Sequence, residues 1–311
     1  MTTVDDMLFH LGGVPVLTGI PFSGESKTFF VDTELGSDSY EGTTPERAKA
    51  SLLAAYNLTT SGNNDVVYFI GRATADTLSA ILVWSNDYTH LIGLSSPLPG
   101  VGQRCRVNAV AAGDLTSLVT WSSDGSICSN MQFMNESDAN VDSGSVVVSG
   151  HRNAFINTMV AGMGHATPAA RAGSYSLGVS GVENHFKNCY IGVDTIVRAA
   201  ANSELDMSGS KNSFWDCTFS SQSETAGKFH VTVSGAGVNI WKDCLFINKS
   251  TNWATTLTNV FNITASSTHH IVLQGANTAV GFTGWADVVT HVYGAGPAAN
   301  AGFGIATNPT T

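Results

Sequence analysis

The feature that most constrains the fold is a pattern that recurs through the middle of the chain. It reads apolar-x-apolar-Ser-Gly-x-x-Asn-x-aromatic-x-Asn/Asp-Cys-x-apolar, and its clearest copies are LGVSGVENHFKNCYI from residue 177 and LDMSGSKNSFWDCTF from residue 205. Further copies begin at residues 119, 146 and 231. The Asn/Asp position therefore falls at 130, 157, 188, 216 and 243, in steps of 27, 31, 28 and 27 residues. A near-constant period of this size indicates a repeat architecture.

Within each copy the apolar residues alternate, which indicates short strands with one buried face. The parity of the alternation changes at the Asn/Asp position. Asn is one of the few residues other than glycine that tolerates the left-handed backbone of a tight bend. Each repeat is therefore predicted to contain three strands and two corners, with the second corner at the Asn/Asp. We expect glycines to form the earlier corner, at Gly150, Gly181, Gly209 and Gly235.

Three short strands per repeat predict a parallel β-helix. A propeller blade needs four strands in about 40 residues, and the Leu/Asn spacing of a leucine-rich repeat is missing. Coils of a β-helix stack at about 4.8 Å, so equivalent side chains form ladders. The stacked thiols should stay reduced, because parallel Cβ vectors hold the Cβ atoms farther apart than the roughly 3.8 Å that a disulfide prefers. The predicted ladders are an aromatic one (Phe155, Phe186, Phe214, Trp241), a thiol one (Cys189, Cys217, Cys244) and a corner one (Asn130, Asn157, Asn188, Asp216, Asp243).

A different kind of segment precedes the coils. The letters FFVD at residues 29–32 predict a strand, and residues 45–58 predict a helix with Thr44 as N-cap and Pro45 at its first position. We therefore divide the chain into four parts: an N-terminal attachment arm (1–27), a capping segment with a helix and the first strands (28–80), the β-helix coils (81–290) and an extended C-terminal tail (291–311).

The segment VDTELGSDSYEGTTPERAKASLLAAYNL, followed by NDVVYFIG, resembles the entry segment of pectate-lyase-like right-handed β-helix proteins. With NDYTHLIGL, GVGQRCRVN, GMGHATPAA and GFGIATNP, residues 28–311 are similar to β-helix structural proteins of tailed bacteriophages. The resemblance implies an all-β fold, a right-handed parallel β-helix (solenoid) with a short N-terminal capping helix. It constrains function loosely, because tailspike enzymes and passive virion proteins share this scaffold.

Composition excludes several classes of partner. The chain has 14 Lys and Arg against 24 Asp and Glu, without a basic run, so we expect no nucleic acid and no anionic membrane surface as partner. No apolar stretch is long enough to span a bilayer, and no positive segment precedes Lys27, so a secretory signal is not expected. The cysteines are widely spaced and the histidines lack ligand spacing, so we expect no metal and no cofactor. These features fit a protein made in the host cytoplasm.

The residues of a polysaccharide-cleaving enzyme are not evident in the coils. Glycoside hydrolysis needs two carboxylates about 5–9 Å apart, whereas Asp216 and Asp243 are better explained as corner residues. By the resemblance, a polygalacturonase-type enzyme would carry Asp-Asp, His-Gly and Arg-x-Lys motifs, which the coils lack. The sequence therefore predicts that the chain is not an enzyme. Isolated basic residues are interpreted as solvated surface groups: Arg171, Lys187, Arg198 and Lys211.

Three aromatic side chains are expected on the outside of the coils, namely Tyr175, Tyr190 and Trp215. Trp215 follows Phe214 of the core ladder and so points outward. It is the best candidate for contact with a host surface glycan or with a neighbouring subunit. Of these two we favour the subunit, in a homotrimer.

Residues 1–27 contain the densest apolar stretch outside the coils. Because the capping helix already closes the core, this stretch needs another surface. It either lies back along its own β-helix or docks on the major capsid protein or another head protein, and we favour docking. The residues assigned to attachment are Leu8, Phe9, Val14, Val16, Ile20 and Phe22.

The predicted function is a structural virion protein of a tailed phage, a capsid decoration or head-fibre protein on the capsid surface. The alternative is a tailspike or fibre protein that binds or depolymerises host surface polysaccharide. A depolymerase would form halos on host lawns and release reducing or unsaturated sugar, which separates the two hypotheses.

If the arm docks on a capsid, deleting residues 1–24 leaves a folded β-helix, because the strand at Phe29, the helix after Pro45 and the coils all lie downstream. Binding to the particle is then lost, as measured by co-sedimentation with undecorated heads. Truncated protein that co-sediments at wild-type occupancy would rule out attachment through the arm. Truncated protein that is insoluble or unfolded would place the arm in the body of the fold.

Overall fold

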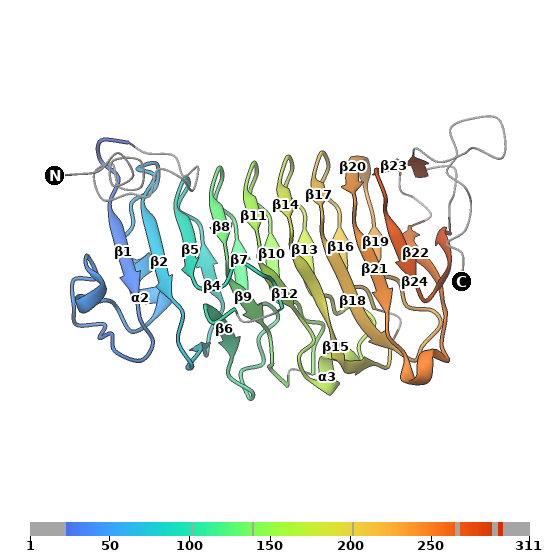
Figure 1. Cartoon of the computed structure of the whole chain (residues 1–311), viewed down its shortest axis with the longest axis horizontal. Coiled ribbons are helices and arrows are strands. Elements are labelled where there is room, and N and C mark those ends of the chain that lie inside the picture. Colours follow the sequence, from blue (N-terminus) through green and yellow to red (C-terminus); the bar gives the residue numbers. More distant parts are fainter. Residues whose placement is uncertain are drawn as a thin grey trace.

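The strands of the chain wind into a parallel β-helix (Figure 1). The structure is a computed structural model that describes residues 23–100, 103–138, 140–200, 202–264, 268–287 and 292–294. Each coil passes through three parallel sheets, here called sheets I, II and III, before a loop returns the chain to sheet I. This arrangement confirms the predicted all-β, right-handed parallel β-helix. The six residues assigned to attachment, from Leu8 to Phe22, lie outside the described residues.

The three sheets run the length of the molecule. Sheet I contains β4 (Leu82–Trp84), β7 (Val119–Trp121), β10 (Val146–Val148), β13 (Leu177–Val179), β16 (Leu205–Met207), β19 (Val231–Val233), β22 (Leu257–Ile263) and β25 (Phe282–Ala286). Sheet II contains β1 (Thr28–Val31), β2 (Val66–Ile70), β5 (His90–Leu94), β8 (Ile127–Ser129), β11 (Ala154–Ile156), β14 (His185–Lys187), β17 (Ser213–Trp215), β20 (Ala236–Lys242), β23 (Thr268–Gln274) and β26 (Val292–Gly294). Sheet III contains β3 (Asp76–Leu78), β6 (Arg106–Ala109), β9 (Gln132–Met134), β12 (Met159–Ala161), β15 (Tyr190–Arg198), β18 (Thr218–Ser223), β21 (Leu245–Asn248) and β24 (Thr278–Val280). Strand β26 lies inside the segment that the sequence assigned to an extended tail.

The single helix predicted for residues 45–58 is wrong, because two short helices occupy this segment. They are the 3-10 helix η2 (Pro45–Arg47) and the α-helix α2 (Leu52–Tyr56). The chain between them is extended, and the Lys49 N–H donates to the Phe30 carbonyl of β1 at 2.9 Å. Ser51, rather than Thr44, provides the side-chain cap, on α2. Helix α2 packs against the first coils, with the Tyr56 ring 4.5 Å from that of Trp84.

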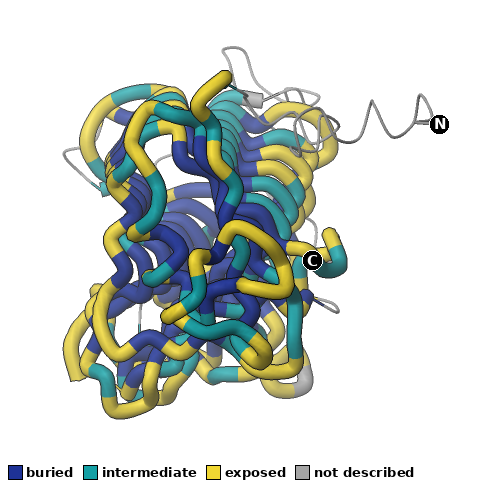
Figure 2. The backbone as a smooth tube through the Cα atoms, turned by 90° about the vertical axis from the view of Figure 1, so that its left-hand side faces the viewer, coloured by how far each residue is buried: buried dark blue, intermediate teal, exposed yellow. Residues whose placement is uncertain are grey.

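Two further short helices, α3 (Ala166–Ala169) and η3 (Thr251–Trp253), lie in loops between sheet III and sheet I. These loops differ in length from coil to coil and carry most of the irregular structure of the β-helix, whereas the other two corners are short. The view along the axis shows the buried residues gathered inside the coils and the exposed ones at the rims (Figure 2).

Stacked aromatic rings form the centre of the core. Phe155, Phe186, Phe214 and Trp241 pair in register along sheet II, and their ring centroids are 5.0, 4.6 and 5.4 Å apart. All four are fully or almost fully buried. Such stacking adds about 0.5–1.5 kcal/mol per pair beyond the burial of area.

A column of thiols lies beside the aromatic ladder. The thiol of Cys189 donates to the Phe155 carbonyl at 3.3 Å, and that of Cys217 to the Phe186 carbonyl at 3.5 Å. Cys244 repeats this contact with Phe214 at 3.3 Å. All five cysteines of the chain are free thiols, and burial raises the pKa of Cys217.

The corner between sheets II and III has a left-handed residue in each of five coils. The backbone φ is 57° at Asn130, 51° at Asn157, 50° at Asn188, 54° at Asp216 and 53° at Asp243. The side-chain amide of Asn188 donates to Oδ1 of Asn157 at 2.8 Å, and that of Asn157 to Oδ1 of Asn130 at 3.1 Å. Asn suits this corner because it tolerates the backbone and continues a hydrogen-bond ladder.

The corner between sheets I and II differs from the expectation that glycine supplies its left-handed residues. The left-handed positions in three coils are Arg152, Glu183 and Lys211, with φ of 57°, 62° and 58°. Gly181 instead allows close stacking, because a Cβ there would lie 1.9 Å from the carbonyl oxygen of Gly150 in the preceding coil. Gly150 and Gly209 make the same close approach, whereas Gly235 has a positive φ of 79°.

A second asparagine ladder, which the repeat analysis missed, is buried beside these glycines. The backbone N–H of each of three asparagines donates to Oδ1 of the next, at 2.9 Å from Asn153 to Asn184, 2.9 Å from Asn184 to Asn212 and 2.7 Å from Asn212 to Asn239. The repeat does contain the signal, since its first Asn occupies the same place in each of these coils except the longer copy at residue 231. These buried amides accept hydrogen bonds from backbone N–H groups at a corner where the chain forms no strand-to-strand hydrogen bonds.

We expect Asn188→Val to be far more destabilising than Lys187→Val. The first change puts a β-branched residue at a φ of 50° and removes the amide that bonds Asn157, at a cost of about 1–3 kcal/mol. The second alters an exposed strand position. Thermal unfolding of the two variants measures the difference, and equal melting temperatures would contradict the role assigned to this corner.

Candidate functional site

The outer face of sheet II carries an exposed tryptophan surrounded by polar side chains. Trp215 is 37 % exposed, whereas its neighbour Phe214 is fully buried. Strand pairing places Lys187 and Lys242 on either side of Trp215 in the same outward column. His185 and Ser213 form the adjacent column. We call these five residues, His185, Lys187, Ser213, Trp215 and Lys242, the Trp215 face.

Contacts within the Trp215 face fix the indole. The Lys242 ammonium lies 5.0 Å from the ring centroid of Trp215, a cation–π contact. The His185 ring meets the indole edge-on, with centroids 4.7 Å apart. Nδ1 of His185 lies 2.7 Å from the Ser213 hydroxyl, so the imidazole is itself held in place.

The Trp215 face is electrostatically distinct from the rest of the molecule. The chain has a net charge of −10, yet the face carries two lysines and no carboxylate. Burial, together with the charge of Lys187, lowers the pKa of His185, so its imidazole is neutral at pH 7. The face therefore presents an apolar ring between two cations, with a neutral hydrogen-bonding pair alongside.

The other two aromatics expected outside the coils are partly covered. The ring of Tyr175 packs against Gly144 and Gly178, whose missing Cβ atoms make room for it. Tyr190 packs in an apolar cluster on the outside of sheet III with Met159 and Val193. Burial raises the pKa of both tyrosines. Of the three, Trp215 has the exposed ring.

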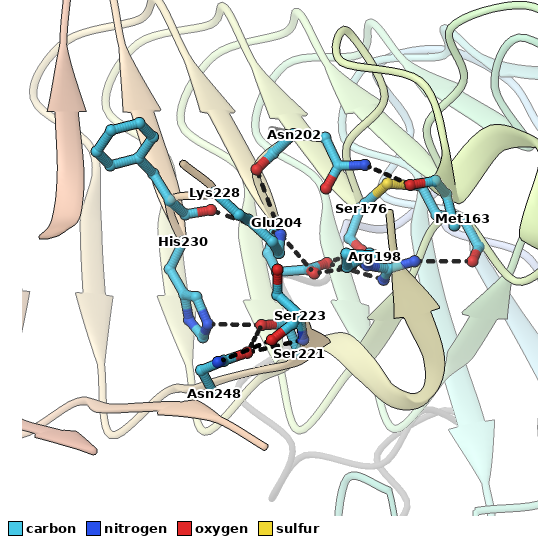
Figure 3. Close-up of polar contacts among 12 residues, drawn as sticks. Met163, Ser176, Arg198, Asn202, Glu204, Ser221, Ser223, Lys228, His230 and Asn248 are labelled. Atoms are coloured by element: carbon cyan, nitrogen blue, oxygen red, sulfur yellow. Dashed lines mark hydrogen bonds and ion pairs between the residues drawn. The ribbon is translucent and has the colours of Figure 1, made fainter. Parts of the chain in front are cut away.

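A second concentration of functional-looking residues is buried under the loops that join sheet III to sheet I (Figure 3). Nε of Arg198 lies 3.1 Å from Oε1 of Glu204, and Nζ of Lys228 lies 3.1 Å from the same oxygen. Ser176 donates its hydroxyl to the other carboxylate oxygen of Glu204. His230 hydrogen-bonds to the Ser221 hydroxyl at 2.9 Å. We call Arg198, Glu204, Lys228 and His230 the buried ion network.

Burial and mutual charge set the ionisation of this network. Burial alone would raise the pKa of Glu204, but Arg198 and Lys228 outweigh it and lower the pKa to about 2. Burial lowers the pKa of Lys228 to about 8 and that of His230 to about 3. Shifted pKa values are typical of active sites, but they also occur in structural ion networks. Here all four side chains have no exposed surface, so a substrate does not reach them in this conformation.

The buried ion network ties successive coils together. Arg198 ends β15, Glu204 directly precedes β16 and Lys228 lies shortly before β19. Nη1 of Arg198 also donates to the carbonyl of Met163, in the preceding coil, at 2.9 Å. We interpret the network as a structural link between loops that the regular ladders do not hold.

The interpretation of four basic residues as isolated, solvated surface groups is wrong for Arg198, which is fully buried in the ion network. Its partner Glu204 lies in a loop between sheets III and I that is unique to its coil and gives no repeat signal. Arg171 and Lys211 lie at the surface, but each has an acidic partner, Asp142 at 3.1 Å and Glu183 at 3.3 Å. The fourth residue, Lys187, is exposed on the Trp215 face.

The described residues form neither a metal centre nor a membrane-spanning helix. Within the part of the chain that the structure describes, no three His, Cys, Asp or Glu side chains gather closely enough to hold a metal ion. Among the same residues, no helix is long and apolar enough to cross a bilayer.

Comparison with known proteins supports the fold. No protein-family model matches the chain, and no curated protein matches it. A solved pectin methylesterase mutant in complex with a hexasaccharide is similar at a TM-score of 0.56 and 16 % identity, over 86 % of this chain and 80 % of that one. A pectate lyase is similar at a TM-score of 0.54 and 12 % identity, over 92 % and 83 %. The ORF18 protein of Geobacillus virus E2 matches at a TM-score of 0.42 and 12 % identity, over 90 % of this chain and 61 % of that one.

These neighbours correct one expectation. The sequence predicted that the chain is not an enzyme, and this is contradicted, because the similar structures include pectin methylesterases and a pectate lyase. At 12–16 % identity the likeness is one of fold, so it assigns no reaction and no catalytic residue to this chain. The structural neighbours are pectate-lyase-like right-handed β-helix proteins.

We expect Glu204→Gln to destabilise the protein by about 3–5 kcal/mol at pH 7, because it leaves two buried cations without their carboxylate. A carboxyl whose pKa falls from 4.5 to about 2 on folding stabilises the protein above pH 4.5 and loses this effect as the pH drops toward 2. The difference between wild type and variant should therefore shrink over that range. Urea unfolding as a function of pH measures it.

The matched control for this experiment is Glu183→Gln. Glu183 also pairs with two cations, Arg152 at 2.7 Å and Lys211 at 3.3 Å, but at the surface. Its loss should cost far less than the loss of Glu204, because solvent screens ion pairs at the surface. Equal costs for the two variants, or a Glu204 effect that is constant from pH 7 to pH 3, would contradict the account of the buried ion network.

Proposed function

We propose that this β-helix binds a polysaccharide on the Trp215 face, with the indole as the stacking platform. The observation that carries the proposal is the exposed Trp215 ring, held between Lys242 at 5.0 Å and His185 at 4.7 Å on a regular sheet. Binding sites for small polar ligands combine an aromatic surface with a few placed polar groups. The ring is held by its neighbours before a ligand arrives, which lowers the entropy lost on binding.

The surroundings of Trp215 favour a sugar over a second subunit as its partner. The centres of protein–protein interfaces are depleted in Lys and Ser and are sealed from water. Lys187, Ser213 and Lys242 all border the indole. Burying two lysines against another chain would carry a desolvation cost, whereas hydroxyl and carboxylate groups of a polysaccharide would pair with them. This reverses the preference drawn from the sequence.

Two lines of comparison support this proposal. Solved pectin methylesterases in complex with hexasaccharides have a similar fold, at TM-scores of 0.56 and 0.53, so coils of this kind can hold an oligosaccharide. The sequence resemblance to phage β-helix proteins supports a place on the virion, where the bound sugar would be a host surface glycan. Attachment to a head protein and assembly as a homotrimer belong to the same proposal.

We expect Trp215→Ala to weaken glycan binding by at least about tenfold, equivalent to 1.4 kcal/mol. A bacterial glycan array identifies the bound polysaccharide, and titration of that glycan followed by fluorescence or calorimetry gives the affinity. The matched control is Trp253→Ala, because Trp253 is 55 % exposed in η3, away from the Trp215 face. This variant should bind as the wild type does.

Three results would contradict the proposal. They are full-length protein that binds no glycan on the array, equal binding by the Trp215 and Trp253 variants, and normal binding by Trp215→Ala with loss of the native oligomer. The last result would assign Trp215 to a subunit contact. Circular dichroism confirms that each variant is folded before binding is measured.

A further inference from the structure

The second asparagine ladder, which runs from Asn153 to Asn239, meets a histidine at its end. Asn239 accepts the Asn212 N–H through Oδ1 at 2.7 Å and donates from Nδ2 to the Gly209 carbonyl at 3.0 Å. In the next coil, Nε2 of His269 also contacts Nδ2 of Asn239. His269 belongs to β23, whose pairing with β20 joins the two coils.

The partners of the His269 ring fix its protonation state. The bonds that Asn239 makes to the preceding coil set the orientation of its amide, so the atom that meets Nε2 is the NH2 nitrogen, which only donates. Nε2 is therefore the unprotonated acceptor. On the other side of the ring, Nδ1 donates to the carbonyl oxygen of Ser234 at 3.1 Å, because a carbonyl only accepts. These two contacts hold His269 in a single neutral tautomer.

We propose that His269 is an acid-sensitive latch between the coil of β20 and the coil of β23. A second proton binds the ring at Nε2, which then becomes a donor that faces the donor of Asn239. Two opposed N–H groups repel each other, so the charged ring leaves the end of the ladder. Acid therefore releases the start of β23, at Thr268 and His269, from the corner beside β20. The latch does not depend on polysaccharide binding.

The charged groups on the described elements around His269 do not favour a charged ring. Residues 234–241, which form the corner and most of β20, contain no acid and no base. Strands β19 and β22 of sheet I contain none either. In the preceding coil Lys211 pairs with Glu183 at the surface, and after β25 the Asp287 carboxylate bonds the backbone of β22. On β23 itself the titratable neighbour is His270, whose charge opposes a second one.

The sign of the pH effect follows from the neutral ring of the latched state. Burial and the charge of His270 lower the pKa of His269 below 6.5 and outweigh the hydrogen bond to Ser234, which raises it. The released ring has an ordinary pKa, so the open state binds more protons than the latched state. The latch is therefore fully stable above pH 6.5 and weakens as the pH falls below that value.

Hydrogen–deuterium exchange of the full-length protein measures the latch locally. Global acid unfolding does not isolate it, because burial also lowers the pKa of His90 to about 4 and that of His230 to about 3. We expect the amide protection of residues 268–271, corrected for the intrinsic exchange rate, to fall by about tenfold or more between pH 7 and pH 5. Strands β10 and β13, far from the latch, should keep their protection over this range.

The variant His269→Gln tests the mechanism of the latch. Oε1 of glutamine accepts a hydrogen bond from Nδ2 of Asn239 in place of Nε2, but it does not take up a proton in this range. Residues 268–271 should then keep their protection at pH 5 to within about a factor of two. The matched control is His270→Gln, one residue farther along β23 and on its other face, which should open in acid as the wild type does.

Nitrogen-15 NMR of the histidine rings adds a readout on the wild-type protein, so the test does not depend on the folding of a variant. At pH 7 we expect His269, assigned through its backbone, to carry its hydrogen on Nδ1 and none on Nε2. A hydrogen on Nε2 at pH 7 would overturn the proposal. So would unchanged protection of residues 268–271 at pH 5, or equal acid opening in the wild type and in folded His269→Gln.

Discussion

The structure depends on register between neighbouring coils. Each side chain of a coil sits beside its equivalent in the next, so one residue type must suit a whole column. The buried amides from Asn153 to Asn239 show the constraint most clearly, since each oxygen accepts from the backbone of the coil before it. An insertion in a strand would break every ladder that passes through it. The corner between sheets I and II of the copy at residue 231 does take one extra residue, and Asn239 and Trp241 still continue their ladders. Most variation lies in the loops between sheets III and I and in the outward columns.

This constraint explains how a regular scaffold comes to carry distinct surfaces. The outward columns of sheet II change character along the axis, while the inward columns stay apolar. At β1, β2 and β5 the outside is apolar and buried. At β14, β17 and β20 it carries Trp215 with lysines on either side. The two surfaces share one sheet face and differ in character, one apolar and buried and the other an exposed indole between two lysines.

The loops between sheets III and I have no repeated sequence, and ion pairs hold two of them together. Arg198 and Glu204 flank one loop and Lys228 lies in the next, and both cations pair with the Glu204 carboxylate. A buried ion network of this kind is costly to break but adds little net stability over an apolar core. In this protein the network fixes loops whose backbone forms no regular hydrogen-bond ladder with the neighbouring coils.

The parts of the structure that repeat could be predicted from the sequence. The period located the coils, and the parity change at Asn188 and its equivalents coincides with the left-handed corner. Prediction failed for residues that have no counterpart in other coils. The helix expected over residues 45–58 is divided because Lys49 pairs with β1, a long-range contact that local propensity does not contain. Arg198 was taken for a surface residue because its partner Glu204 lies in a unique loop.

The role of the glycines was also misjudged, for a related reason. A Ser-Gly pair in each repeat fits a left-handed corner, but the structure uses Gly181 for its lack of a Cβ against the previous coil. Close approach between coils is a property of the tertiary structure. It requires a glycine, as a turn often does, so the sequence alone does not distinguish the two. Whether the chain carries out a reaction was beyond the reach of motif reasoning, because the absence of one family's residues does not exclude another chemistry.

The central claim is that the exposed indole of sheet II is where this protein meets a polysaccharide. A crystal structure of the full chain with the oligosaccharide selected on the glycan array tests it most directly. The account predicts a sugar ring lying flat on the indole of Trp215 at about 4 Å, with its polar groups directed at Lys187 or Lys242. An oligosaccharide bound to sheet I or sheet III, with the Trp215 face empty, would contradict it.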